Sequence, residues 1–357
     1  VIRERPLPGA VLTRVAQSHI RVGTFQVFAA RQDNERLQTL YDYTVDRHYP
    51  DARDPLDLLN GVIERQAQLV TQWMGVGFIH GVMNTDNCAL SGETIDYGPC
   101  AFMDAYDPDT VFSSIDRFGR YGYAAQADII VWNMAQLATA LVPLMPDTDK
   151  AVEDFTKAVH AMPDRLRALW LDRFGAKIGL SAPTQEDLSL IGDLLTLMHE
   201  GGADFTNTFR ALADGEARDQ FTDRAAFDGW EARWQARLEQ EDDPQALMRA
   251  VNPVLIPRNH RVEQMIEASV AGDDAPFHRL NAALAAHGQL VEEHVHQHGL
   301  ARADGGRKRD QATTCDRGLQ IMGKLGMMLG LEKAEINRRP CQAVIAHHLG
   351  LHQPLRL

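Results

Sequence analysis

Residues 80–104 read HGVMNTDNCALSGETIDYGPCAFMD, and this stretch decides how the rest of the chain is interpreted. It mixes short apolar runs, glycines and acids without helical spacing, which predicts loops and a hairpin. Its polar side chains include Asp86 with Asn87, and then Asp96. Amide and carboxylate oxygens are hard ligands that suit a Mg²⁺ ion holding nucleotide phosphates. A second carboxylate beside them can accept a proton from a hydroxyl group, so the stretch predicts a site for transfer chemistry.

The spacing of these residues is similar to that of kinase loops, in which H-R-D-x-x-x-x-N precedes D-F-G. Aligning His80 with the kinase histidine places Asn87 on the metal-binding asparagine and Asp96 on the metal-binding aspartate. The kinase base then falls on Val82, which cannot take a proton, so an ordinary kinase interpretation fails there. Asp86 is the obvious replacement. A capped turn with solvated acids is the alternative without chemistry.

Helices are predicted on both sides of this stretch. The range 24–48 looks helical with a break near 31–34, and 54–74 carries one apolar stripe behind a capping Asp54. Helical spacing returns at 127–141. Further helices are predicted at 149–161, 164–174, 184–199, 204–213, 223–239, 243–251 and 259–271. A short β-type run is expected at 9–16.

The overall composition narrows the class of protein. With 357 residues, 45% of them hydrophobic and 24% charged, the chain is typical of a soluble globular protein with two or three lobes. Acids outnumber bases 49 to 36, and the net charge of −13 repels phosphate backbones, so no nucleic-acid partner is expected. We find no run of about 18 apolar residues and expect no membrane partner. Four cysteines without a CxxC pair favour a reducing, intracellular setting.

The charge balance changes near residue 288. Residues 288–357 contain 10 Lys and Arg against 7 Asp and Glu, whereas the first 287 residues contain 26 against 42. Such a break predicts a boundary between two parts of the chain.

Eight longer strings carry a resemblance to a known family. They are PGAVLTRVAQSHIRVGTF, DRHYP, HGVMNTDN, TIDYGPCAFMDAYDPD, GRYGYAAQ, VWNMAQLATAL, DFTNTFRALAD and NPVLIPRNHRVEQMI. Together they resemble the selenoprotein O family, also called the YdiU family of protein adenylyltransferases, over roughly residues 5–285. The resemblance implies an α+β, protein-kinase-like (pseudokinase) fold that is mostly α-helical in this portion. It implies the end of a small lobe at 1–23, a large C-terminal lobe with a helical extension at 24–287, and a divergent tail at 288–357.

The resemblance also implies an activity and the residues that perform it. It implies Mg²⁺-dependent transfer of AMP from ATP onto Ser, Thr or Tyr hydroxyls of proteins, with Mn²⁺ and UMP as options. In the family the nucleotide is reversed relative to kinases, so the α-phosphate is attacked and pyrophosphate leaves. Asp86 would accept the proton, Asn87 and Asp96 would hold the metal, and Asp96 would also lie near the nucleotide. Arg14 and Arg21 would contact the ATP phosphates as forked donors, and surface pairing with acids is the alternative for both arginines.

Several expectations remain beside this interpretation. The family's glycine-rich segment, lysine and acidic partner lie upstream of the region that matches Val1, so we expect these 357 residues alone to be inactive. A cytoplasmic, bacterial-like location is expected, with organellar targeting left open. One rival function is a kinase that moves the γ-phosphate, with Asp86 as a displaced base. The other is a scaffold that binds partners and catalyses nothing.

Overall fold

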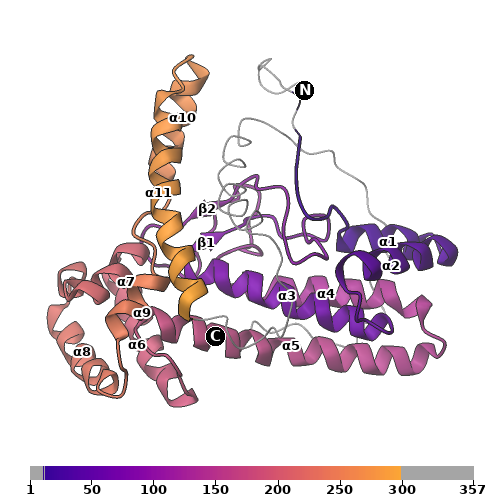
Figure 1. Ribbon diagram of the computed structural model, residues 1–357, viewed down its shortest axis with the longest axis horizontal. Coiled ribbons are helices and arrows are strands. Elements are labelled where there is room, and N and C mark those ends of the chain that lie inside the picture. The colour runs from indigo at the N-terminus through magenta and orange to yellow at the C-terminus, as the bar shows by residue number, and fades with distance from the viewer. Residues whose placement is uncertain (1–10, 12, 299–357) are drawn as a thin grey trace.

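The computed structural model describes Val11 and residues 13–298, with side chains as far as residue 286. Three long helices lie side by side and form the centre of this part of the chain: α3 (Pro55–Gly75), α4 (Gln126–Leu141) and α5 (Thr148–Lys177) (Figure 1). Two shorter helices, α1 (Val22–Ala30) and α2 (Asn34–His48), lie at one end of them. The predicted helices at 24–48, 54–74 and 127–141 are therefore confirmed, with the expected break between α1 and α2.

The sequence of α3 explains why it is a helix and where it begins. Asp54 accepts a hydrogen bond from the backbone nitrogen of Asp57 at 2.9 Å, and Pro55 occupies the first helical position. Apolar residues three and four positions apart form one buried stripe, including Leu58, Val62 and several others further along the helix. This stripe packs against α4 and α5.

Helix α4 is the apolar centre of the fold. Among the described residues, the window Gln126–Leu144 is the one that is long and apolar enough to cross a membrane, and 61% of it is buried inside the protein. The expectation that no such run exists was therefore too strong for this segment. Helix α4 is buried against α1, α3 and α5, as expected for a helix in a protein core. A core helix can be as long and as apolar as a membrane-spanning one.

The two helices predicted at 149–161 and 164–174 are a single helix, α5, so that prediction was wrong. Pro163 lies inside it and cannot donate the usual backbone hydrogen bond. Residues on both sides of Pro163 continue one buried stripe, from Phe155 and Val159 to Leu166 and Trp170. Burial of that continuous stripe outweighs the local cost of proline, which is about 3 kcal/mol.

Strands are few in the described part of the chain. Strand β1 (Phe78–Ile79) pairs antiparallel with β2 (Ala101–Phe102), and Phe78 lies opposite Phe102. This two-residue ladder confirms the predicted hairpin and closes the loop between the strands. The β-type run predicted at 9–16 is wrong for its described residues, Val11 and 13–16, which form no strand.

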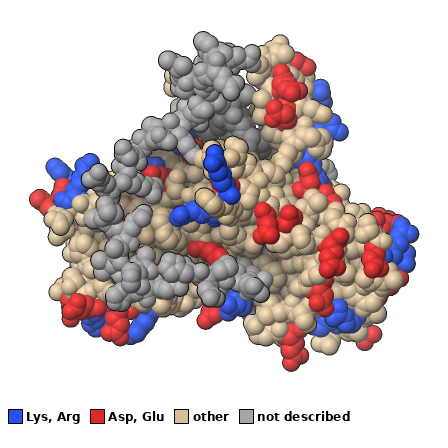
Figure 2. All heavy atoms as spheres, turned by 180° about the vertical axis from the view of Figure 1, so that it is seen from behind, with Lys and Arg blue, Asp and Glu red and all other residues tan. Residues whose placement is uncertain are grey.

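Beyond α5 the chain forms a second group of helices. Their bounds are η2 (Gln185–Asp187), α6 (Leu188–Gly201), α7 (Phe205–Asp214), η3 (Ala217–Gln220), α8 (Arg224–Leu238), α9 (Pro244–Val251), α10 (Asn259–Val270) and α11 (Ala275–His298). A short 3₁₀ helix, η1 (Val142–Leu144), lies before α5. The predicted helices at 184–199, 204–213, 223–239, 243–251 and 259–271 are confirmed within a few residues, and α11 was not predicted. Acidic and basic side chains adjoin over the α6–α9 end of the surface (Figure 2).

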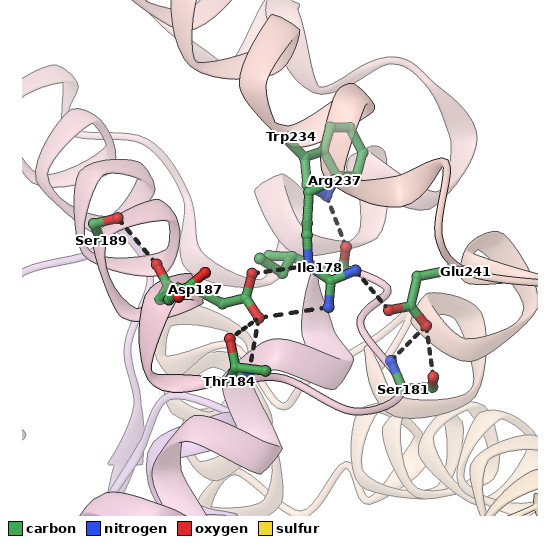
Figure 3. Close-up of polar contacts among 9 residues, drawn as sticks. Ile178, Ser181, Thr184, Asp187, Ser189, Trp234, Arg237 and Glu241 are labelled. Carbon is green, nitrogen blue, oxygen red and sulfur yellow. Dashed lines mark hydrogen bonds and ion pairs between the residues drawn. The ribbon is translucent and has the colours of Figure 1, made fainter.

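One polar cluster joins α8 to the segment that precedes α6. The guanidinium of Arg237 donates to Asp187 at 2.9 Å and to Glu241 at 3.0 Å (Figure 3). Ser181 and Thr184 donate to the same two carboxylates from the connecting loop. Burial alone would raise the pKa of Asp187, but the bonds from Thr184 and Arg237 outweigh it, and the pKa lies below its ordinary value. The cluster is therefore an ionic tie within the helical group.

The fold class is confirmed at its coarser level, because the described chain is mostly α-helical with few strands. The kinase-like character and the division into 1–23, 24–287 and 288–357 stay predictions. The part of the tail from 299 onward lies outside the described residues.

Candidate active site

The candidate site is the loop that the β1–β2 ladder closes. Side chains of the buried helix α4 hold this loop by hydrogen bonds to its backbone. The fully buried amide of Gln126 accepts a hydrogen bond from the backbone nitrogen of His80 at 3.0 Å and donates to the carbonyl of Phe78 at 3.0 Å. Two turns further along α4, the Asn133 amide donates to the carbonyl of Met83 at 2.9 Å. Two side chains of one rigid helix thus fix the start of the loop.

His80 is fully buried and bonds several residues of the loop. Its Nδ1 accepts from the backbone nitrogen of Val82 at 3.3 Å, so its Nε2 carries the proton and faces the Thr94 hydroxyl at 2.8 Å. The Thr94 hydroxyl in turn donates to the carbonyl of Asn87 at 2.8 Å. Burial lowers the pKa of His80 to about 4, so this imidazole is neutral and structural. The chain of bonds joins the HGVM, TDN and TID strings of the sequence.

Asn87 is held with its amide oxygen free. Its side-chain nitrogen donates to the carbonyl of Val82 at 2.8 Å, which fixes the orientation of the amide because a carbonyl accepts only from the nitrogen. No donor among the described residues bonds to its oxygen. An oriented amide oxygen without a protein donor is suited to a cation.

Asp96 lies close to Asn87, because Ile95 donates its backbone nitrogen to the Asn87 carbonyl at 3.3 Å. Asp96 adopts a φ of +64°, a left-handed conformation that aspartate tolerates better than most residues. Its side chain is 50% exposed, and Nη2 of Arg14 lies 3.4 Å from its Oδ1. The structure therefore pairs one predicted phosphate-binding arginine with one predicted metal ligand.

Asp86 and Arg21 come together at the start of α1. Nη1 of Arg21 donates to the backbone carbonyl of Asp86 at 3.0 Å, which leaves the Asp86 carboxylate unused. That carboxylate is exposed, and no hydrogen bond or ion pair engages it within the described chain. Nε of Arg21 is buried and has no hydrogen-bond partner in the described part of the chain, so it is a donor that a bound anion could satisfy.

All five predicted residues thus form one cluster, made by two segments about 70 positions apart in the sequence. The described residues contain no group of three or more His, Cys, Asp or Glu side chains that could hold a metal. The donor set that fits Mg²⁺ is the Asn87 oxygen with the Asp96 carboxylate. Two protein ligands suffice for this ion when substrate phosphates and waters complete its shell.

Two cysteines flank the cluster and take no part in it. Cys88 is buried and Cys100 is partly buried, and burial raises the pKa of each thiol to about 12. Neutral thiols of this kind are unreactive, so these two cysteines serve as packing residues.

The analysis of the sequence missed the residues that hold the loop. Gln126 was a signal that could have been used, since a polar residue at the start of an apolar helix is either exposed or bonded. Thr94 lies two positions before Asp96 and carries no local signal of its own. The start of α1 offered another sign, because Arg21 stands where Ser, Thr, Asp or Asn usually caps a helix.

Comparison with known proteins identifies the family of this chain. A family model described as protein adenylyltransferase SelO matches residues 1–285. A protein nucleotidyltransferase YdiU of Ruegeria pomeroyi is 61% identical over 285 residues, which is 80% of this chain and 60% of that protein. The protein of the same name from Roseobacter denitrificans is 63% identical over 280 residues, or 78% of this chain and 60% of that protein. A third, from Ruegeria sp. TM1040, is 58% identical over 315 residues, or 88% and 66%.

These matches define a class of proteins named for nucleotidyl transfer to proteins. The chain belongs to the SelO family, as the resemblance of its motifs indicated. The chain spans about three fifths of the length of the curated relatives it matches.

Proposed function

We propose that the gene product containing this chain transfers AMP from ATP to hydroxyl groups of proteins. The observation that carries the proposal is the state of three groups on one loop: the Asp86 carboxylate and the Asn87 amide oxygen bond to no described residue, and the Asp96 carboxylate has one long contact, with Arg14 at 3.4 Å. Other side chains hold the loop, so the first two groups are available for a ligand, and Asp96 becomes available when Arg14 moves to a phosphate. Family membership and the names of the relatives support the same chemistry.

We propose that nucleotide binding uses both segments of the cluster within a kinase-like fold. Asn87 and Asp96 would hold Mg²⁺, or Mn²⁺ in its place. When bound, the ion would supply neutralisation of the polyphosphate charge. Arg14 would leave Asp96 to bind phosphate, and Arg21 would offer its unused Nε. In a chain with a net charge of −13, such local donors are needed to hold a phosphate ligand.

The proposed step is a displacement at the α-phosphorus of ATP. The acceptor hydroxyl oxygen forms a bond to that phosphorus, the bond to the bridging oxygen of the β-phosphate breaks, and pyrophosphate leaves. The hydroxyl proton passes to the Asp86 carboxylate, which no protein donor occupies. Val82, at the position of the kinase base, could not take it.

The partners that follow are ATP and proteins that expose Ser, Thr or Tyr hydroxyls. The acidic charge of the chain supports the absence of a nucleic-acid partner, and the proposal includes neither a membrane partner nor a location outside the cytoplasm. Transfer of UMP is a variant of the same step with a different base.

The first prediction compares labels on ATP. The gene product that contains this chain is incubated with Mg²⁺, a test protein and ATP labelled at the α- or the γ-phosphate. We expect α-label, and no γ-label, to remain on protein. Retention of γ-label alone would establish the kinase alternative, and retention of neither label would favour the scaffold.

Two variants assign the residues in the same assay. Asp86→Asn keeps the shape but cannot accept the proton, so transfer should fall about 10²–10⁴-fold while Mg²⁺-dependent ATP binding persists in calorimetry. Asp96→Asn keeps the tolerance for φ of +64° and should weaken both binding and transfer. Asp46→Asn, on the exposed side of α2, is the control. An Asp86 variant as active as the wild type would remove that residue from the mechanism.

A further inference from the structure

The site contains a glycine whose missing side chain leaves room for a carboxylate. A Cβ added to Gly23 would lie 2.2 Å from Oδ1 of Asp86 and 3.3 Å from its Cγ. The first distance is far below any van der Waals contact. Gly23 has no positive φ, so its backbone conformation is open to any residue. The requirement for glycine at this position is therefore one of space.

The backbone on both sides of this contact is held in place, so an added side chain at position 23 would have to displace the Asp86 carboxylate. Gly23 donates its backbone nitrogen to the carbonyl of Thr85 at 2.9 Å, and Val22 donates to the carbonyl of Cys88 at 3.0 Å. The first N–H groups of a helix have no partner within the helix, and here the loop supplies their acceptors. Together with the bond from Arg21 to the Asp86 carbonyl, these contacts tie α1 directly to the loop on both sides of Asp86.

Glycine is also a poor choice for the helix itself. In the first turn of α1 an alanine would lose less conformational freedom on folding. The other glycines within helices include Gly192 in α6, where an added Cβ would meet nothing within 4 Å. Gly23 differs from Gly192 because its space is filled by the side chain proposed as the proton acceptor.

We propose that Gly23 is a positioning residue, which sets where the Asp86 carboxylate lies relative to Asn87 and Asp96. The inference rests on the proposed function. It adds that the acceptor carboxylate is seated against the first turn of α1, and that any side chain at position 23 displaces it. Gly23 touches no reacting atom and acts through Asp86 alone.

The second prediction tests this placement by kinetics. Gly23→Ala should lower kcat for AMP transfer at least ~10-fold, since displacement of a catalytic group by about 1 Å can cost 10²-fold. The affinity for Mg²⁺-ATP should stay within about twofold, because Asn87, Asp96 and Arg14 are untouched. Gly192→Ala is the matched control, with unchanged kcat. The Gly23 and Asp86 effects should not add, so Gly23→Ala with Asp86→Asn should equal Asp86→Asn alone.

A measurement of stability tests the same contact without any activity. Gly23→Ala should lower the urea midpoint in the wild-type background. In an Asp86→Ala background, the nearest remaining atom beyond the carboxylate is the Thr85 carbonyl oxygen, at an ordinary 3.4 Å. There the same substitution should leave the midpoint unchanged or raise it, as expected for alanine in a helix. This second background remains informative if Gly23→Ala alone folds poorly.

The outcomes separate the inference from the proposed function. If Asp86→Asn is inactive but Gly23→Ala has the wild-type kcat, the inference is wrong and the function stands. If Asp86→Asn is itself active, the proton acceptor is lost and the inference falls with it. An equal loss of midpoint from Gly23→Ala in both backgrounds would show that the carboxylate does not occupy the space.

Discussion

The loop at 80–96 and the group of helices beyond α5 are held by different kinds of contact. In the helical group, Arg237 pairs with Asp187 and Glu241, and Arg258 pairs with Asp104 and Asp204. The carboxylates in these contacts are therefore already paired with an arginine. In the loop, the buried folding contacts come from neutral side chains, those of His80, Thr94 and Gln126.

The difference shows which acids are available for chemistry. An acid that holds two helices together cannot change partner without loss of stability. The Asp86 carboxylate makes no hydrogen bond or ion pair with the described residues, and Asp96 has one long contact with Arg14 at 3.4 Å. A site that must bind phosphates and accept a proton needs groups of this second kind. The contrast therefore separates structural acids from candidate functional ones without reference to any relative.

The third prediction removes the ionic tie in the helical group. The side chains of Arg237, Asp187 and Glu241 are 19%, 6% and 7% exposed, so Arg237→Ala leaves two nearly buried carboxylates without their cation. The free energy of unfolding should fall by about 3 kcal/mol, measured by urea denaturation. ATP affinity of the folded protein should not change, since the cluster lies outside the loop.

The control for this change is a pair with similar geometry and more solvent. Arg218 bonds Asp228 at 2.6 Å, but both side chains are 47% exposed. Arg218→Ala should therefore cost clearly less than Arg237→Ala. Equal losses would mean that burial does not distinguish these pairs, and the contrast with the loop would weaken.

The fourth prediction breaks the neutral support of the loop. Gln126→Leu keeps the volume but leaves the His80 nitrogen and the Phe78 carbonyl without a partner inside the core. We expect a loss of about 2–3 kcal/mol in the free energy of unfolding. AMP transfer should also fall, because the loop that carries Asp86 loses its anchor on α4.

Gln68→Leu is the matched control, because Gln68 is exposed on α3 and, among the described residues, its side chain bonds Glu64 alone. It should change neither stability nor transfer appreciably. If Gln126→Leu lost stability but kept full transfer, the loop would not depend on this anchor for its active shape.

Much of this architecture could be predicted from the sequence. Helix positions followed from apolar spacing and from caps such as Asp54, which are local signals. The hairpin could be predicted from the short apolar runs, glycines and acids of residues 80–104. Pro163 misled the prediction because a local rule was applied where a long buried stripe decided the outcome. In both the helical group and the loop, secondary structure could be predicted where the pattern that determines it lies within one segment of the sequence.

The site could be predicted only in part, for the same reason. Asp86, Asn87 and Asp96 lie within one short stretch and could be found by spacing and resemblance. Gln126 and Gly23 act on that stretch from 30 or more positions away, so no local pattern reports them. Their roles depend on side-chain packing between elements, which spacing does not encode.

The fifth prediction concerns pH and is the smallest of the effects expected here. His80 has a pKa of about 4 in the folded protein because of burial, against an ordinary value of 6.5. Its folded pKa is depressed, so the unfolded chain takes up a proton as the pH falls below about 6.5 and the folded chain does not. Stability is therefore lost progressively between pH 6.5 and about pH 4. From pH 7 to pH 5 the loss should be about 2 kcal/mol.

The measurement compares wild type with His80→Gln, which cannot be protonated. His80→Gln is less stable at pH 7 because it loses the bond to Thr94, but its unfolding free energy should fall less toward pH 5. Other titrating groups, such as His48, act in both proteins and cancel in the difference. His160→Gln, on the exposed side of α5, controls for removal of a histidine as such. Parallel pH profiles for wild type and His80→Gln would contradict a neutral, buried His80. The buried support of the loop would then include a charged group, and its contrast with the ionic helical group would have to be given up.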